Sequence, residues 1–116
     1  MSEKVKYKAI TDKEFEQIIL TDGNFSILVF AAEWSGNSEI MDSIMERISK
    51  EYDKDIQFFK ADIEKQKSIA EFFNIFSIPT TLIVKNGEVV DLIRGLVPAA
   101  EMRRKLSKHI ENSKQE

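Results

Sequence analysis

The pattern of apolar and polar positions divides the chain into predicted strands and helices. Residues 25–32 are almost all apolar, with β-branched and aromatic members, which is typical of a strand buried on both faces of a sheet. Shorter apolar runs at residues 4–10, 55–61, 80–84 and 89–93 predict the other strands. Between these runs the apolar residues recur at helical spacing, so we expect helices to alternate with most of the strands.

The predicted helices have recognisable starts, and each has one apolar side. Thr11 to Glu14 has the capping-box pattern, and Pro98 suits the first turn of the last helix. In the second helix, polar residues such as Asp42 fill the side opposite the apolar stripe. We expect the stripes to pack in the core. They are Phe15, Ile18 and Ile19; Ile40, Met41, Ile44, Met45, Ile48 and Tyr52; Ile69, Ala70, Phe72 and Phe73; and Ala99, Met102, Leu106 and Ile110.

The connections between the strands define an α/β fold class. A long helix joins residues 25–32 to residues 55–61, so these two strands should be parallel, with a right-handed crossover. Asn86-Gly87 between two apolar runs predicts a type I′ hairpin, which makes the last two strands antiparallel. The chain therefore predicts a mixed sheet of four or five strands with helices on both faces. We expect one domain over residues 1–110 and a polar tail at residues 111–116 that frays.

Composition and charge narrow the possible functions. The chain has 116 residues, enough for one core, and a net charge of −3 from 17 basic and 20 acidic residues that are mixed along it. There is no basic stripe, no cluster with metal-ligand spacing and no Gly-rich phosphate loop. We therefore expect the protein to bind no nucleic acid, no metal ion and no cofactor. No apolar run is long enough to span a membrane and no apolar leader follows Met1, so we expect a soluble cytoplasmic protein. Zero cysteines exclude disulfides, thiolate metal sites and a dithiol redox cycle of this chain's own.

Short strings along residues 7–110 resemble the thioredoxin family. Ala32-Glu33-Trp34 stands where the family has the tryptophan before its first active-site cysteine, and Ile78-Pro79-Thr80 resembles the family's cis-proline segment. The resemblance implies a thioredoxin fold in which Pro79 is cis and faces the active site. The other matching positions are Gly36, Lys60, Lys85-Asn86-Gly87-Glu88-Val89 and Gly95.

The chain departs from this family at the positions that carry its chemistry. Ser35 and Ser38 stand at the two cysteine positions, and Asn37 stands at the proline between them. Val29 stands where the family buries an aspartate, and Ser43 stands where it has a helix-kinking proline. Exposed N–H groups at a helix N-terminus stabilise a thiolate, which is the nucleophile in thiol–disulfide exchange. Without cysteine this chemistry is lost.

The serines also lack what a serine nucleophile needs. A serine hydroxyl requires a positioned base, usually histidine, and the only histidine is His109, close to the C-terminus. We therefore interpret Ser35 as a helix N-cap and Ser38 as a small polar residue one turn in. We assign no catalytic residue.

The binding surface that the resemblance implies does not depend on sulfur. In the family, the backbone beside the cis-proline pairs with an extended peptide, and the tryptophan, the residue before the proline and the late glycine loop form a shallow apolar groove. We expect a monomeric, redox-inactive module that binds an extended peptide or a protein partner. The matching residues are Trp34, Ser35, Gly36, Asn37, Ile78, Pro79, Gly95 and Leu96.

Other interpretations stay open. Trp34 could pack against its own loop, with Ile78 and Leu96 as ordinary boundary residues. The phenylalanine-rich segment 72–76 could extend the groove, although we expect most of it in the core. The chain could also be a thioredoxin-type oxidoreductase whose cysteines have been exchanged for serine, or a structural subunit that buries this face against a fixed partner.

Overall fold

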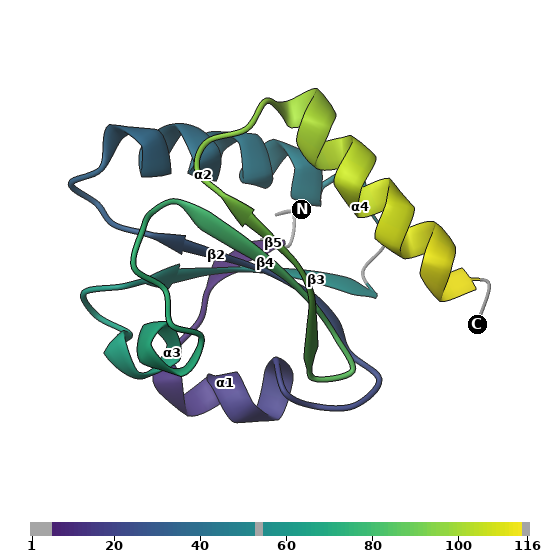
Figure 1. Cartoon of the computed structure of the whole chain (residues 1–116), viewed down its shortest axis with the longest axis horizontal. Coiled ribbons are helices and arrows are strands. Elements are labelled where there is room, and N and C mark those ends of the chain that lie inside the picture. Colours follow the sequence, from purple (N-terminus) through teal and green to yellow (C-terminus); the bar gives the residue numbers. More distant parts are fainter. Residues whose placement is uncertain (1–5, 53–54, 115–116) are drawn as a thin grey trace, which may run out of the picture.

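Five strands form one mixed sheet in the computed structural model, which describes residues 6–52 and 55–114 (Figure 1). The strand order is β1-β3-β2-β4-β5. β3 runs parallel to β1 and β2, whereas β4 is antiparallel to both β2 and β5. The predicted mixed α/β sheet is therefore confirmed. The strands are β1 (Tyr7–Ala9), β2 (Phe25–Ala31), β3 (Ile56–Asp62), β4 (Thr80–Lys85) and β5 (Glu88–Arg94).

The helices lie on both faces of this sheet. They are α1 (Asp12–Ile18), α2 (Gly36–Ser49), α3 (Lys67–Phe72) and α4 (Ala99–Lys114). Helices α1 and α3 cover one face, and α2 and α4 cover the other (Figure 1). The connection from β2 to β3 runs through α2, as expected for parallel strands.

The C-terminal helix is longer than predicted. Helix α4 runs to Lys114, so residues 111–114, which we expected to fray, are helical. Backbone hydrogen bonds within a helix can continue past its last apolar contact, and the end of the apolar stripe is therefore a poor guide to the end of the helix. Residues 115 and 116 of the predicted tail, and residues 4 and 5 of the predicted first strand, lie outside the described residues.

Each face of the sheet has its own apolar core. Side chains of a strand alternate between the two faces, so neighbouring residues of β2 enter different cores. Leu28 and Phe30 pack with α1 and α3, whereas Ile27 and Val29 pack with α2 and α4. All of them are completely buried. This double burial explains the nearly continuous apolar run that predicted a central strand.

Two local sequence signals are confirmed. Thr11 caps α1 with a capping box, because its side chain accepts a hydrogen bond from the Glu14 N–H and its own N–H donates to the Glu14 carboxylate at 3.0 Å. Asn86 and Gly87 have φ angles of 55° and 80°, as a type I′ turn requires. The turn joins β4 to β5 as an antiparallel hairpin.

Gly87 has no room for a side chain. A β-carbon there would lie 2.7 Å from the carbonyl oxygen of Leu20, and the positive φ also disfavours any other residue. We expect Gly87→Ala to lower the free energy of unfolding by about 2 kcal/mol, measured by urea unfolding. Gly36→Ala is the matched control, because nothing lies within 4 Å of the added carbon. An equal loss in both variants would contradict this explanation.

Several apolar residues that we expected in the core are exposed instead. Ile40 of α2 is 51% exposed. Helix α3 has six residues and buries only one side. Its C-cap residue Phe73 packs against the core on this face of the sheet, whereas Phe72 is 58% exposed and packs in a T-shaped arrangement with the Phe15 ring. Phe76, in the loop after α3, is 92% exposed. The expectation that most of segment 72–76 lies in the core is therefore wrong for Phe72 and Phe76.

Candidate functional site

The turn from β2 into α2 ends in a serine cap. Ser35 has extended backbone angles, φ −97° and ψ 116°, and its Oγ accepts a hydrogen bond from the Ser38 N–H at 3.2 Å. Its own N–H donates to the carbonyl oxygen of Ala32 at 3.1 Å. The interpretation of Ser35 as the N-cap is confirmed, and its hydroxyl satisfies one of the free N–H groups of the first helical turn.

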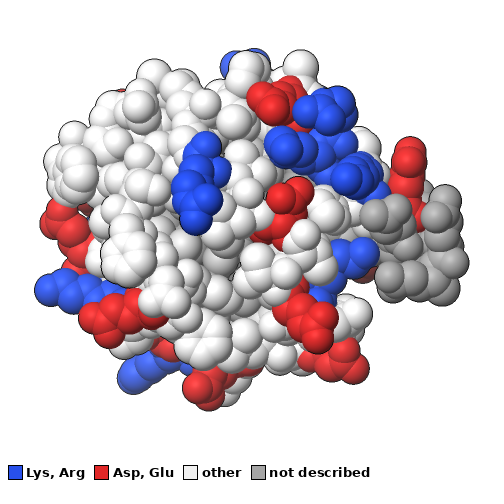
Figure 2. Space-filling model, viewed as in Figure 1, with Lys and Arg blue, Asp and Glu red and all other residues white. Residues whose placement is uncertain are grey.

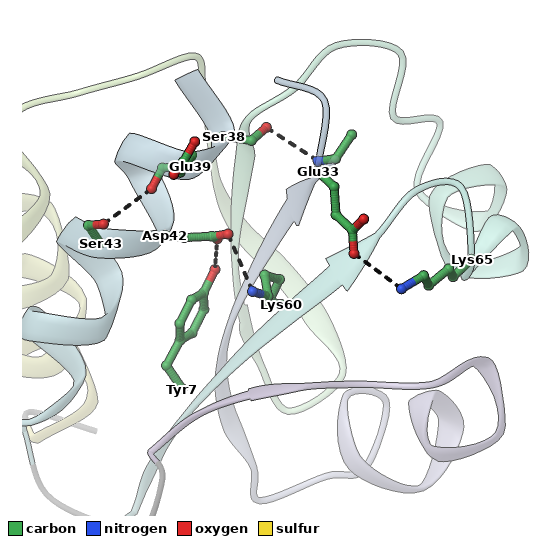
Figure 3. Close-up of polar contacts among 9 residues, drawn as sticks. Tyr7, Glu33, Ser38, Glu39, Asp42, Ser43, Lys60 and Lys65 are labelled. Atoms are coloured by element: carbon green, nitrogen blue, oxygen red, sulfur yellow. Dashed lines mark hydrogen bonds and ion pairs between the residues drawn. The ribbon is translucent and has the colours of Figure 1, made fainter. Parts of the chain in front are cut away.

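Ser38 lies buried beneath this turn. Its side chain is buried, and its Oγ accepts a hydrogen bond from the Ala32 N–H at 3.3 Å (Figure 3). No imidazole reaches it, because His109 lies on α4 with its Nε2 2.9 Å from the Asp91 carboxylate. The two serines therefore hydrogen-bond within the turn, and the one histidine of the chain reaches neither of them.

A charged network lies below the turn, where the resemblance places a buried aspartate. Val29, at that position, is completely buried in the apolar core. Lys60 of β3 instead pairs with Asp42 of α2, with its Nζ 3.3 Å from Oδ2 (Figure 3). The Tyr7 hydroxyl donates to Asp42 Oδ1 at 2.7 Å. Burial, and then the charge of Asp42 and its hydrogen bond, raise the pKa of Tyr7 well above its usual range.

Sequence reasoning missed the role of Asp42. We placed this residue on the solvent side of the second helix, and the structure corrects that placement, because its carboxylate points toward Tyr7 and Lys60 (Figure 3). Ser38 and Asp42 are four residues apart and so share a helix face. This spacing, together with a buried Ser38, is the signal that could have placed Asp42 toward the sheet.

A polar cleft opens beside this network at the carboxyl ends of the parallel strands. Its volume is about 510 Å³. Its charged side chains are largely paired with each other, since Lys60 binds Asp42 and Lys65 binds Glu33 at 3.3 Å (Figure 3). Within residues 6–52 and 55–114, no group of three or more His, Cys, Asp or Glu side chains could hold a metal ion. The lining residues are Ala9, Ile10, Ala31, Ala32, Glu33, Glu39, Asp42, Lys60, Asp62, Lys65 and Gln66.

The sheet register brings the predicted groove residues to one edge. Phe30 at the end of β2 pairs with Thr80 at the start of β4, and Thr80 pairs with Arg94 at the end of β5. The β2–α2 turn, the α3–β4 loop and the β5–α4 loop therefore meet at the same end of the sheet (Figure 1). The Gly95 N–H donates to the Pro79 carbonyl at 2.7 Å, which joins two of these loops.

The backbone beside Pro79 presents free hydrogen-bonding groups. The Ile78–Pro79 peptide bond is cis, and the Pro79 ring is buried. Among the residues that the structure describes, neither the N–H nor the carbonyl of Ile78 has a hydrogen-bond partner. Ile78 lies just outside β4, so these groups are not used by the sheet. They can pair with an added extended chain.

Exposed apolar side chains lie around this backbone. Trp34 is 68% exposed, and its ring N–H donates to the Glu64 carboxylate, so it does not fold down onto its own loop. Leu96 is 39% exposed, and Phe76, from the segment that we considered as an extension of the groove, is 92% exposed. Gly36 and Asn37 are also exposed at the start of α2. We use the name loop groove for the predicted binding surface with Phe76 added, which consists of Trp34, Ser35, Gly36, Asn37, Phe76, Ile78, Pro79, Gly95 and Leu96.

The chain is similar to known thioredoxins over nearly its whole length. The family model described as Thioredoxin matches residues 6–108. The thioredoxin of Chlorobaculum thiosulfatiphilum is 32% identical over 105 residues, which cover 90% of this chain and 97% of that protein. The thioredoxin of Buchnera aphidicola is 35% identical over 101 residues, which cover 87% of this chain and 94% of that protein.

A solved structure has the same fold. The crystal structure of Malassezia sympodialis thioredoxin matches with a TM-score of 0.79 at 22% identity, over 94% of this chain and 95% of that one. The expected fold is therefore confirmed. No helix in the described part of the chain has both the length and the apolarity to cross a membrane.

Proposed function

Because the chain belongs to the thioredoxin family but contains no cysteine, we propose that it is a redox-inactive member that binds an extended peptide segment of a partner protein in the loop groove. Thiol–disulfide exchange requires a thiolate, and serine does not provide one. Ser35 and Ser38 instead hydrogen-bond within their own turn. In this proposal the protein works as a monomer in the cytoplasm.

The free backbone of Ile78 is the observation that carries the proposal. Its N–H and carbonyl have no partner in the described residues, and an extended peptide could use both by adding a strand. The rings of Trp34 and Phe76, which are 68% and 92% exposed, provide apolar contact area. Large aromatic side chains with exposed faces are the residue types that most often dominate binding energy.

The expected result of a binding experiment is a localised response. Peptides selected from a random displayed library against the whole protein should shift the backbone amide NMR signals of Trp34, Ile78 and Leu96. Selection against the variant Ile78→Pro, which removes the N–H donor, should not recover the same peptides. Thermal unfolding of the variant checks that it folds. Val90→Ala, at an exposed position of β5 farther from the loop groove, is a control that keeps binding.

Two results would contradict the proposal. One is a set of selected peptides whose NMR shifts map to the polar cleft or to α4. The other is a library that yields no peptide with measurable affinity for the folded protein.

A thioredoxin-type oxidoreductase with exchanged cysteines is the second candidate. Trp34, Gly36 and the capped helix start keep the frame in which the family places its dithiol. The codons for Ser35 and Ser38 in the source gene distinguish the two. Cysteine codons would favour the oxidoreductase, and serine codons would favour a protein that functions without a dithiol.

A further inference from the structure

Arg94 is a charged residue at the rim of the loop groove. It is the last residue of β5, lies opposite Thr80 in the register and precedes Gly95, which is hydrogen-bonded to Pro79. Its side chain is exposed, and it makes no ion pair with any residue in the described ranges. Arg103, by contrast, is bound to Glu51 through two hydrogen bonds of 2.8 and 2.7 Å.

The surface around Arg94 has few charges that could neutralise it. Figure 2 shows a largely uncharged area at the upper left of the view, over the start of α2 and the α3–β4 loop. Leu92 and Leu96, each two residues from Arg94, are 37% and 39% exposed. An unpaired guanidinium therefore lies beside exposed apolar side chains.

The Trp34 side of the groove has two carboxylates, and one of them is paired with a cation. Glu64 accepts the ring N–H of Trp34, and Glu33 is paired with Lys65 at 3.3 Å. A ligand cation therefore gains less at Glu33, which already has a counter-charge, than a ligand anion gains at Arg94. Glu64 keeps its negative charge because an indole N–H is neutral, so the groove is asymmetric, with negative charge on the Trp34 side and positive charge at the end of β5.

We propose that the peptide bound in the loop groove carries an acidic side chain, which Arg94 binds while neighbouring apolar side chains contact Trp34 and Phe76. A guanidinium forms paired, charge-assisted hydrogen bonds with a carboxylate, and the apolar surroundings lower the local dielectric. The inference rests on the proposed function, because it names the chemical class of peptide for that same groove. Peptides with a basic residue at this position are disfavoured by the like charge.

A glutamate scan tests this assignment. A capped synthetic peptide of alternating serine and apolar residues, with phenylalanine but no tryptophan, carries one glutamate that is moved through each serine position. Matched sets carry glutamine or lysine instead. Binding is followed by the fluorescence of Trp34, the only tryptophan of the chain. We expect glutamate at one or two nearby positions to bind about fivefold more tightly than glutamine, and this preference should disappear in high salt.

Two variants identify the group responsible. Arg94→Gln should bind the glutamate and glutamine peptides equally, and Arg94→Glu should prefer the lysine peptide. Arg104→Gln is the matched control, because it removes an exposed arginine from α4, and it should keep the glutamate preference.

The possible outcomes separate the two proposals. Peptides that bind with no glutamate preference, or a preference that persists in Arg94→Gln, would overturn the role of Arg94 and leave the groove intact. A complete lack of binding by every peptide would overturn the groove, and the role of Arg94 with it.

Discussion

Replacing Trp34 with alanine should weaken the binding of a selected peptide by about 30-fold. Trp34 is the largest exposed apolar residue beside the free backbone of Ile78, and the loss of a central aromatic contact commonly costs about 2 kcal/mol of binding free energy. Because the variant lacks the fluorescent ring, titration calorimetry measures the change. The free energy of unfolding should hardly move, since a ring that is 68% exposed contributes little to the core.

Trp34→Phe is the matched control. It keeps an apolar ring but loses the N–H that donates to Glu64, so we expect a much smaller loss of affinity than in Trp34→Ala. Phe76→Ala should weaken binding in the same direction, because its ring is 92% exposed in the loop that leads to Ile78. Normal affinity in both alanine variants would exclude the loop groove as the binding surface.

The fold was predictable because its signals are local. The apolar run that becomes β2, the capping box at Thr11 and the Asn86-Gly87 turn each depend on residues close together in the sequence. The observed ends of β2 and β3 lie within a residue of the predicted ones. The similarity of short strings to a known family then implied the thioredoxin fold, which is confirmed.

The exposed aromatic residues were less predictable. An apolar side chain in the sequence indicates burial, but it does not say which element covers it. Phe72 is the last residue of a six-residue helix, and Phe76 lies in the loop after it, so no further helix within the described residues covers these two side chains. Periodicity over so short a helix cannot distinguish a core residue from a residue at the rim.

The charged network was unpredictable for a different reason. Tyr7, Asp42 and Lys60 come from β1, α2 and β3, and their contact depends on how a helix is rotated against the sheet. The sequence showed that a buried acid is absent from β2, where Val29 stands. It did not show that Lys60 has a carboxylate partner from another element.

Removing the carboxylate of Asp42 should therefore destabilise the protein. Asp42→Ala leaves the buried Tyr7 hydroxyl without its acceptor and Lys60 without its counter-charge, and we expect a loss of about 2 kcal/mol in the free energy of unfolding. Tyr7→Phe removes the hydroxyl and supplies the control. The double variant should lose clearly less free energy of unfolding than the sum of the two single variants, because without the Tyr7 hydroxyl no buried donor is left unpaired. Strictly additive losses would contradict a direct Tyr7–Asp42 interaction.

The same network predicts a loss of stability at alkaline pH. Burial, together with the charge of Asp42 and its hydrogen bond, raises the pKa of Tyr7 in the folded protein, whereas an unfolded tyrosine ionises near pH 10. The folded state therefore holds a proton that the unfolded state releases, and the stability that is complete below about pH 10 falls as the pH rises further. At pH 11 this single group should cost about 1.4 kcal/mol. Urea unfolding between pH 9 and 11 should show this loss in the unmodified protein and a correspondingly smaller loss in Tyr7→Phe. If the free energy of unfolding fell equally with pH in both proteins, the Tyr7 hydroxyl would ionise as easily in the folded protein as in the unfolded chain.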